Sequence, residues 1–282
     1  MRQLTKPTDD AGDVFIECIS IVRNPALKKR LTEVKDLIVK ASTELDKKVT
    51  KGKLHTIKQE TVINGNVTSK ELEDVYTIRM VPKGTPGRKI YDKIKIAAPL
   101  GICPLCGHRE VKTIDHYLPK TKYPRLAVAP INLLPACTDC NDIKDVHHPT
   151  KSSEEFLHPY YDTIEGDLWL KARIDHNTPA AIQFFVESPS DWDELLSERV
   201  KYHFDTLQLN GLYSVQAAVE LININFGLRE IYTTKGASGV KKHLLKQAQT
   251  RKHANQNSWQ SAMYSAMAED EWFCDGGFRL KT

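Results

Sequence analysis

Apolar side chains recur at helical spacing near the start of the chain. Asn24 and Pro25 come directly before this stripe, and they supply a preferred N-cap and a proline suited to the first helical turn. The stripe itself consists of Leu27, Leu31, Val34, Ile38, Ala41 and Leu45. The pattern predicts one long amphipathic helix over residues 24–45.

Over residues 54–81 the helical spacing gives way to β-branched residues. Asn64-Gly65 in this stretch is a strong hairpin signal, because both central positions of a type I′ turn need a positive φ. We therefore expect a small β-element here, with residues 75–81 as a further strand. A turn-rich segment follows at residues 82–87, and a short basic helix is expected from Ile90 onward.

The centre of the chain predicts a strand, a loop, a strand and a helix, in that order. Residues 109–117 and 131–134 read as extended segments, with an irregular loop at residues 119–130. A helix is expected to begin at Thr138. Further on, residues 168–174 and 180–187 predict two strands, Ser190-Asp191 predicts a helix cap, and helices are expected over residues 213–225 and 240–267.

Composition excludes a membrane-spanning protein. Of the 282 residues, 40% are hydrophobic and 27% are charged, and no apolar run reaches the roughly 18 residues of a membrane helix. The first ten residues lack the apolar core of a signal peptide, so we expect a cytoplasmic protein. The net charge of +4 is too small to establish a nucleic-acid partner by itself.

Positive charge gathers toward the C-terminus. Residues 231–268 contain no acid, and their lysines and arginines are Lys235, Lys241, Lys242, Lys246, Arg251 and Lys252. Such a segment is a candidate for phosphate contacts. A solvated helix face or a partner surface explains it equally well.

Four of the six cysteines form two C-x-x-C pairs, Cys103 with Cys106 and Cys137 with Cys140. In a cytoplasmic chain this pattern favours a metal site over disulfides. Four thiolates fill the tetrahedral shell of one zinc ion and leave no open position, so the zinc would be structural. A redox C-x-x-C pair is the alternative. The two remaining cysteines, near the ends of the chain, are expected to be ordinary thiols.

Between the cysteine pairs, Asp115 and His116 interrupt an apolar run. Phosphodiester hydrolysis needs a base that activates water and a cation that offsets the charge developing on the phosphate. A neutral imidazole supplies the base, and a carboxylate with an amide oxygen holds a hard cation. Adjacent residues point to opposite faces of a straight strand, so both can reach one phosphate only if the strand ends or twists here. Pro119 indicates that it ends.

These residues together resemble the HNH family of ββα-metal endonucleases. The resemblance lies in Asp115-His116, in Asn132 sixteen residues after His116, and in Asn141 directly after the last cysteine. It implies that His116 is the general base, that Asp115 and Asn141 hold one divalent ion, and that Asn132 pins the loop that orients His116. Many members have histidine where Asn141 stands, and the oxygen ligand favours magnesium or manganese over a second zinc.

A longer set of segments resembles one branch of this family. Residues 115–120, 123–124, 133–135 and 156–162 are similar to the HNH nuclease subunits of anti-phage systems such as Septu and some retrons. Members act beside an ABC-type ATPase, so the resemblance implies a partner-gated nuclease. The expected fold class is α+β. We expect an N-terminal helix and hairpin extension at residues 1–89, a zinc-stapled ββα-metal core at residues 90–162, and a two-strand and helical region at residues 163–282.

Basic residues around the expected site are candidates for phosphate contacts. Lys144 lies one helical turn after Asn141, although a solvated side chain is the stronger expectation for it. Lys120, Lys122 and Arg125 lie in the loop that must border the site, where a solvated loop is an equally good interpretation.

The expected function is a metal-dependent endonuclease acting on DNA in phage defence, with RNA not excluded as substrate. The main alternative is a zinc-knuckle module that binds nucleic acid or a partner without turnover. A bacteriocin-type toxin and a restriction enzyme with its own sequence specificity are further alternatives. The sequence leaves the oligomeric state and the identity of any partner open.

Overall fold

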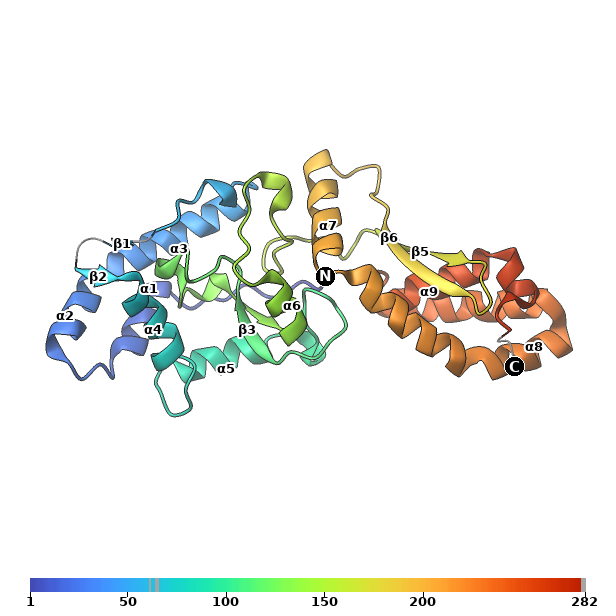
Figure 1. The fold of residues 1–282 in the computed structure, drawn as a ribbon, viewed down its shortest axis with the longest axis horizontal. Coiled ribbons are helices and arrows are strands. Elements are labelled where there is room, and N and C mark those ends of the chain that lie inside the picture. The colour runs from blue at the N-terminus through green and yellow to red at the C-terminus, as the bar shows by residue number, and fades with distance from the viewer. Residues whose placement is uncertain (61, 64–65, 280–282) are drawn as a thin grey trace. The chain divides into compact units, whose positions relative to one another are not determined.

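The structure is a computed structural model that describes residues 1–60, 62–63 and 66–279 (Figure 1). The chain forms two compact units, Met1–Thr163 and Ile164–Thr282. Both units combine helices with antiparallel strand pairs, and this confirms the predicted α+β class. Within these residues, no helix has both the length and the apolar character needed to cross a bilayer.

The helices of the first unit are α1 (Ala11–Ile19), α2 (Pro25–Glu33), α3 (Lys35–Val49), α4 (Ser69–Arg79), α5 (Arg88–Ile96) and α6 (Thr138–Lys144). Asn24 caps α2 by accepting a hydrogen bond from the Leu27 N–H at 3.0 Å. The prediction of one long helix is wrong at Val34, whose φ of −95° and ψ of 5° separate α2 from α3. Val34 is buried like the rest of the apolar stripe, so the periodicity continues across the break and does not reveal it.

Helix α4 lies where residues 75–81 were predicted to form a strand, so that prediction is wrong. Thr68 and Glu71 form a capping box, in which each side chain accepts a hydrogen bond from the other residue's backbone N–H. The buried residues Leu72, Val75 and Tyr76 follow helical spacing. The β-branched content favoured a strand, but the cap and the spacing of the buried face decide the structure.

The predicted hairpin corresponds to a very short strand pair. β1 (Val62–Ile63) and β2 (Val67–Thr68) are antiparallel, with Ile63 opposite Val67. The predicted turn at Asn64-Gly65 lies outside the described residues. The paired element is therefore much smaller than the β-element expected over residues 54–81.

Two strands and a helix form the middle of the first unit. β3 (Thr113–His116) and β4 (Leu133–Ala136) are antiparallel, with Thr113 opposite Ala136 and His116 opposite Leu133. Helix α6 follows β4 directly, and α5 and α6 both contact β3. The predicted order of strand, loop, strand and helix is confirmed, with a shorter first strand. β3 ends at His116, as predicted from the proline three residues later.

In the second unit, β5 (Leu170–Asp175) and β6 (Ala181–Val186) confirm the two predicted strands. Its helices are α7 (Glu194–Thr206), α8 (Leu209–Ala254) and α9 (Trp259–Glu269). Helix α8 packs against β6 and α9 against β5, which places the core of this unit between the strand pair and the two helices (Figure 1).

Helix boundaries in the second unit differ from the predicted ones. The cap of α7 is Asp193, which accepts a hydrogen bond from the Leu196 N–H at 2.7 Å, and not Ser190-Asp191. Helix α8 extends far beyond residues 213–225 and contains one non-helical residue, Gly236. The helix predicted over residues 240–267 is divided, because Ser258 caps the separate helix α9.

Candidate active site and metal centre

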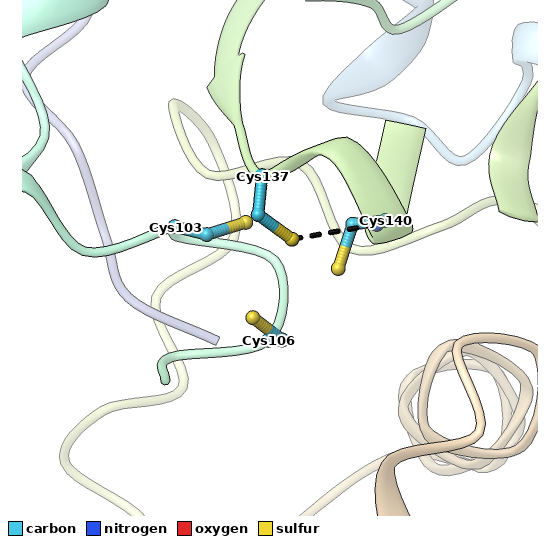
Figure 2. A group of neighbouring side chains, drawn as sticks. All are labelled: Cys103, Cys106, Cys137 and Cys140. Carbon is cyan, nitrogen blue, oxygen red and sulfur yellow. Dashed lines mark hydrogen bonds between the residues drawn. The ribbon is translucent and has the colours of Figure 1, made fainter. Parts of the chain in front are cut away.

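The four paired cysteines come together in the first unit (Figure 2). Cys103 and Cys106 lie on the loop before β3, and Cys137 and Cys140 lie where β4 passes into α6. Their sulfur atoms are all within 4.8 Å of one another, and all four residues are buried. A zinc ion bound at about 2.3 Å from each sulfur would hold the sulfurs about 3.8 Å apart. The donor set and its spacing therefore fit a structural zinc ion.

Backbone N–H groups point at two of these sulfurs. The Arg109 N–H donates to Cys106 Sγ and the Cys140 N–H donates to Cys137 Sγ, each over 3.4 Å. Hydrogen bonds among the four thiols lower the pKa of Cys106 and Cys137 and raise the pKa of Cys103 and Cys140. The opposite shifts mean that the four side chains titrate as one group, in which Cys103 and Cys140 keep their protons more readily than Cys106 and Cys137. A divalent ion allows all of them to be thiolates.

The other two cysteines are ordinary buried thiols. Burial raises the pKa of Cys18 to about 12 and also raises the pKa of Cys274. In the part of the chain that the structure describes, no other group of three or more histidine, cysteine or acidic side chains is arranged to hold a metal ion. A redox pair would need two cysteines, whereas four gather here, which favours the metal site over the redox alternative.

A cavity of about 440 Å³ adjoins the end of β3. Asp115 and His116 from β3 and Asn141 from α6 all line it, so the structure brings three of the four predicted catalytic residues together. Lys120 and Asp145 line it as well. Asp145 was missed in the sequence, where it is one acid among many. It follows the last residue of α6 with a φ of 37° and a ψ of −122°, a backbone conformation that non-glycine residues rarely adopt.

His116 has a fixed tautomer. Its side chain is buried, and Nε2 lies 2.8 Å from the carbonyl oxygen of Ala127. A carbonyl only accepts hydrogen bonds, so Nε2 carries the proton and Nδ1 carries the lone pair. Burial lowers the pKa of His116 to about 3, so the imidazole is neutral at pH 7. Nδ1 has no hydrogen-bond partner among the described residues, so its lone pair is unengaged.

Lys144 is buried against Asp115, so the expectation of a solvated lysine is wrong. Its Nζ lies 3.2 Å from Asp115 Oδ2 and 2.6 Å from the carbonyl oxygen of His116, and it is 1% exposed. Burial raises the pKa of the Asp115 carboxyl, and the positive charge of Lys144 opposes this rise. The contact of Asp115 Oδ2 with the Lys144 ammonium group is an ion pair without hydrogen-bond geometry, so this buried oxygen keeps lone pairs that no described residue occupies. An oxygen in this state is suited to a cation.

Asn132 does not line the cavity, and its side chain is fully buried beneath the loop between β3 and β4. Its Oδ1 accepts a hydrogen bond from the Leu118 N–H at 2.8 Å. Its Nδ2 donates to the carbonyl oxygens of Leu118 and Leu126, at 3.0 and 3.2 Å. These bonds close the loop that carries Ala127, whose carbonyl holds the His116 ring. Asn132 thus acts on the site through the backbone.

The three basic residues of this loop have different surroundings. Lys120 lines the cavity. The Nζ atom of Lys122 lies 2.6 Å from His148 Nδ1, and Arg125 pairs with Glu60 at 2.8 Å. Lys120 is therefore the one of the three that is placed to contact a phosphate in this cavity.

The chain is partly similar to known proteins. It is 33% identical over 174 residues to protein ea31 of Escherichia phage lambda, a match that covers 60% of this chain and 58% of ea31. It is 39% identical over 61 residues to Septu protein PtuB of Bacillus thuringiensis, a match that covers 22% of this chain and 23% of PtuB. The chain thus spans less than two thirds of these relatives. The expected similarity to a Septu protein is confirmed for this short part of the chain. No family model matches, and no solved structure matches.

Proposed function

We propose that this protein is a metal-dependent HNH endonuclease that hydrolyses phosphodiester bonds of DNA. The observation that carries the proposal is a neutral His116 of fixed tautomer in the same cavity as the Asp115 carboxylate and the Asn141 amide. A module that only binds nucleic acid has no use for a base beside a pair of oxygen ligands. The antiparallel pair of β3 and β4 followed by α6 is the element order of the family and supports the proposal.

The residues of the cavity divide the chemistry between them. Asp115 and Asn141 would hold one magnesium or manganese ion through their side-chain oxygens. When bound, this ion offsets the negative charge that develops on the phosphate and on the leaving oxygen. His116 Nδ1 takes a proton from the attacking water while the water oxygen bonds to phosphorus and the bond to the leaving oxygen breaks. Lys120 contributes positive charge beside the phosphate.

Lys144 and Asn132 position the catalytic groups. Lys144 links the Asp115 carboxylate to the backbone carbonyl of His116 and so fixes the end of β3. Asn132 fixes the loop that carries Ala127. Neither side chain needs to touch the substrate for its loss to disturb the site.

The proposed setting is anti-phage defence, in which Septu systems act. The similarity to PtuB supports this setting. The resemblance to this branch of the HNH family also favours an ABC-type ATPase as a partner chain. ATP hydrolysis would then be supplied by that partner.

A nicking assay on supercoiled plasmid tests the proposal. Wild type with magnesium or manganese should convert the plasmid to the open circular form, and chelator should stop the reaction. His116→Ala should abolish nicking while zinc content and folding stay intact. His176→Ala is the matched control, because His176 is an exposed histidine of the second unit, and it should leave nicking unchanged.

A wild-type protein that binds DNA but never nicks it, alone or with its ATPase partner, would favour the binding module. Equal nicking by wild type and His116→Ala would show that the base has been assigned wrongly.

A further inference from the structure

A second hollow of the first unit is lined by lysines. This lysine groove, of about 550 Å³, runs along the C-terminal half of α3, and its charged lining is Lys40, Glu44, Lys47, Lys48, Lys51 and Lys53. The five lysines and one glutamate give it a formal charge of +4, which equals the net charge of the entire chain.

Most of these charges have no counter-charge. Lys48 pairs with Glu44 at 2.6 Å. In the described part of the chain, no acid pairs with Lys40, Lys47, Lys51 or Lys53. The negative end of the α3 dipole favours basic residues in its last turn, which accounts for Lys47 and Lys48. The helix dipole does not account for Lys51 and Lys53, which lie beyond the end of α3. Because like charges close together repel one another, this group of lysines points to an anionic ligand.

The groove continues toward the proposed active site. A smaller cavity of about 290 Å³ shares Lys40, Glu44 and Lys48 with it. This cavity is also lined by Lys58 and Glu60, and it reaches Tyr123 and Arg125 of the loop between β3 and β4. Thr121 of the same loop lines the catalytic cavity. Thr121 and Tyr123 are two residues apart, so their Cα atoms are separated by at most about 7 Å. Both cavities are therefore lined by residues of one short loop segment, and α3 packs against the turn Pro124–Leu126 that follows it.

The spacing of the lysines suits a nucleic-acid backbone. Lys40 and Lys47 lie on one helix, seven residues and about 10 Å apart along its axis. One strand of duplex DNA rises about 3.4 Å per phosphate, so this distance corresponds to about three phosphates. A single free phosphate group would leave most of the lysines unpaired.

We infer that the lysine groove binds the phosphodiester backbone of DNA next to the segment held in the catalytic cavity. The inference rests on the proposed function and names the path of its substrate. Backbone contacts of this kind position the strand without reading its sequence. Residues 231–268, the basic segment seen in the sequence, are a second candidate, but they belong to the second unit, whereas the lysine groove and the catalytic cavity both belong to the first.

Fluorescence anisotropy with a labelled 20-base-pair duplex tests the inference without any need for cleavage. Both variants are made in a His116→Ala background. Lys47→Gln, Lys51→Gln and Lys53→Gln together remove three charges from the groove. Lys29→Gln, Lys83→Gln and Lys201→Gln together remove three exposed charges outside both basic segments and serve as the matched control. The groove variant should weaken binding at least tenfold and reduce the slope of log Kd against log salt by about 2–3. The control should change Kd less than twofold.

The two proposals fail in different ways. Wild-type protein that nicks plasmid, with unchanged DNA affinity in the groove variant, would overturn the groove inference and leave the nuclease proposal standing. A groove variant that loses affinity for ATP, measured by calorimetry, but keeps its affinity for DNA would also overturn it in favour of a nucleotide site. DNA binding that depends on the groove in a protein that never cleaves would support the groove and refute the nuclease.

Discussion

Substitution of Asn132 by alanine is a sharp test of how the loop between β3 and β4 is held. The side chain is fully buried and makes three hydrogen bonds, all to backbone groups of that loop. Alanine removes all three and adds no new partner. The variant therefore removes one amide side chain and leaves the cysteine cluster and the residues that line the cavity unchanged.

The magnitude follows from the groups that lose their partners. Leu118 loses a partner at both its N–H and its carbonyl, for which the described structure shows no substitute. The Leu126 carbonyl keeps the N–H of Ala129 at 3.2 Å. A buried group left without a partner costs about 1–3 kcal/mol, so two such groups predict a loss of about 2–6 kcal/mol in the free energy of unfolding of the first unit. This is a large part of the roughly 5–15 kcal/mol that stabilises a typical domain.

The distribution of tryptophans allows the two units to be followed separately. All four of them lie in the second unit, at Trp169, Trp192, Trp259 and Trp272. Tryptophan fluorescence in a urea titration therefore reports the second unit, whereas far-ultraviolet circular dichroism reports both. Asn132→Ala should shift part of the circular dichroism transition to lower urea and leave the fluorescence midpoint in place.

Asn257 provides a matched control in the second unit. Its Oδ1 accepts from the N–H groups of Trp169 and Leu170, and its Nδ2 donates to the carbonyl oxygen of Asp167. Asn257→Ala should shift the fluorescence transition instead. A loss below about 1 kcal/mol in Asn132→Ala, or a shift of the fluorescence midpoint alone, would refute the reasoning that these hydrogen bonds hold the first unit.

Two further substitutions test the cysteine cluster and a tight contact in the first unit. Cys106→Ser should abolish zinc binding, measured by elemental analysis, and unfold the first unit, because structural zinc contributes about 10–16 kcal/mol in zinc-finger peptides. Cys274→Ser is the control and should keep the zinc. Retained zinc with an unchanged melting curve in Cys106→Ser would contradict the assignment. Gly87→Ala should destabilise the first unit by about 1–3 kcal/mol in urea titration, because a Cβ there would lie 2.6 Å from Cys18 Sγ and 2.9 Å from the last backbone carbonyl of α4. Gly166→Ala, where a Cβ meets nothing within 4 Å, should change stability by less than about 0.5 kcal/mol, and equal effects of the two would show that the contact is not tight.

The cysteine cluster and the cavity residues could be predicted because they lie close together in the sequence. The C-x-x-C spacing places two ligands on one turn, and 30 residues separate the two pairs. Asp115 and His116 are neighbours at the end of β3, and Asn141 follows the last cysteine. If a zinc ion joins the two cysteine pairs, the residues between them form a closed loop. Few conformations of such a loop keep these side chains apart. The prediction needed only the identity of neighbouring residues and the joining of the two cysteine pairs at one metal site.

Helix and strand boundaries were less predictable, because tertiary burial decides them. Val34 is buried, so the apolar stripe passes through the break between α2 and α3. The β-branched residues Val75, Thr77 and Ile78 favoured a strand, but they lie in α4, which Thr68 and Glu71 cap. In each case the sequence showed correctly which residues are buried. It did not determine whether the backbone there forms a continuous helix, a broken helix or a strand.

The burial of Lys144 and the lysine groove follow from contacts between segments that are distant in the sequence. Lys144 meets the carboxylate of Asp115, which lies 29 residues earlier, and loses its solvent there. The smaller cavity beside the groove joins α3 to Tyr123 and Arg125, more than 70 residues later in the chain. No local pattern records either contact, because a lysine on a helix has the same sequence signature whether it is solvated or paired. Spacing therefore predicts the groups that we propose to be catalytic, while the fold determines which charges surround them. If both proposals hold, the first unit builds its substrate path from its N-terminal helices and its reaction centre from β3, β4 and α6.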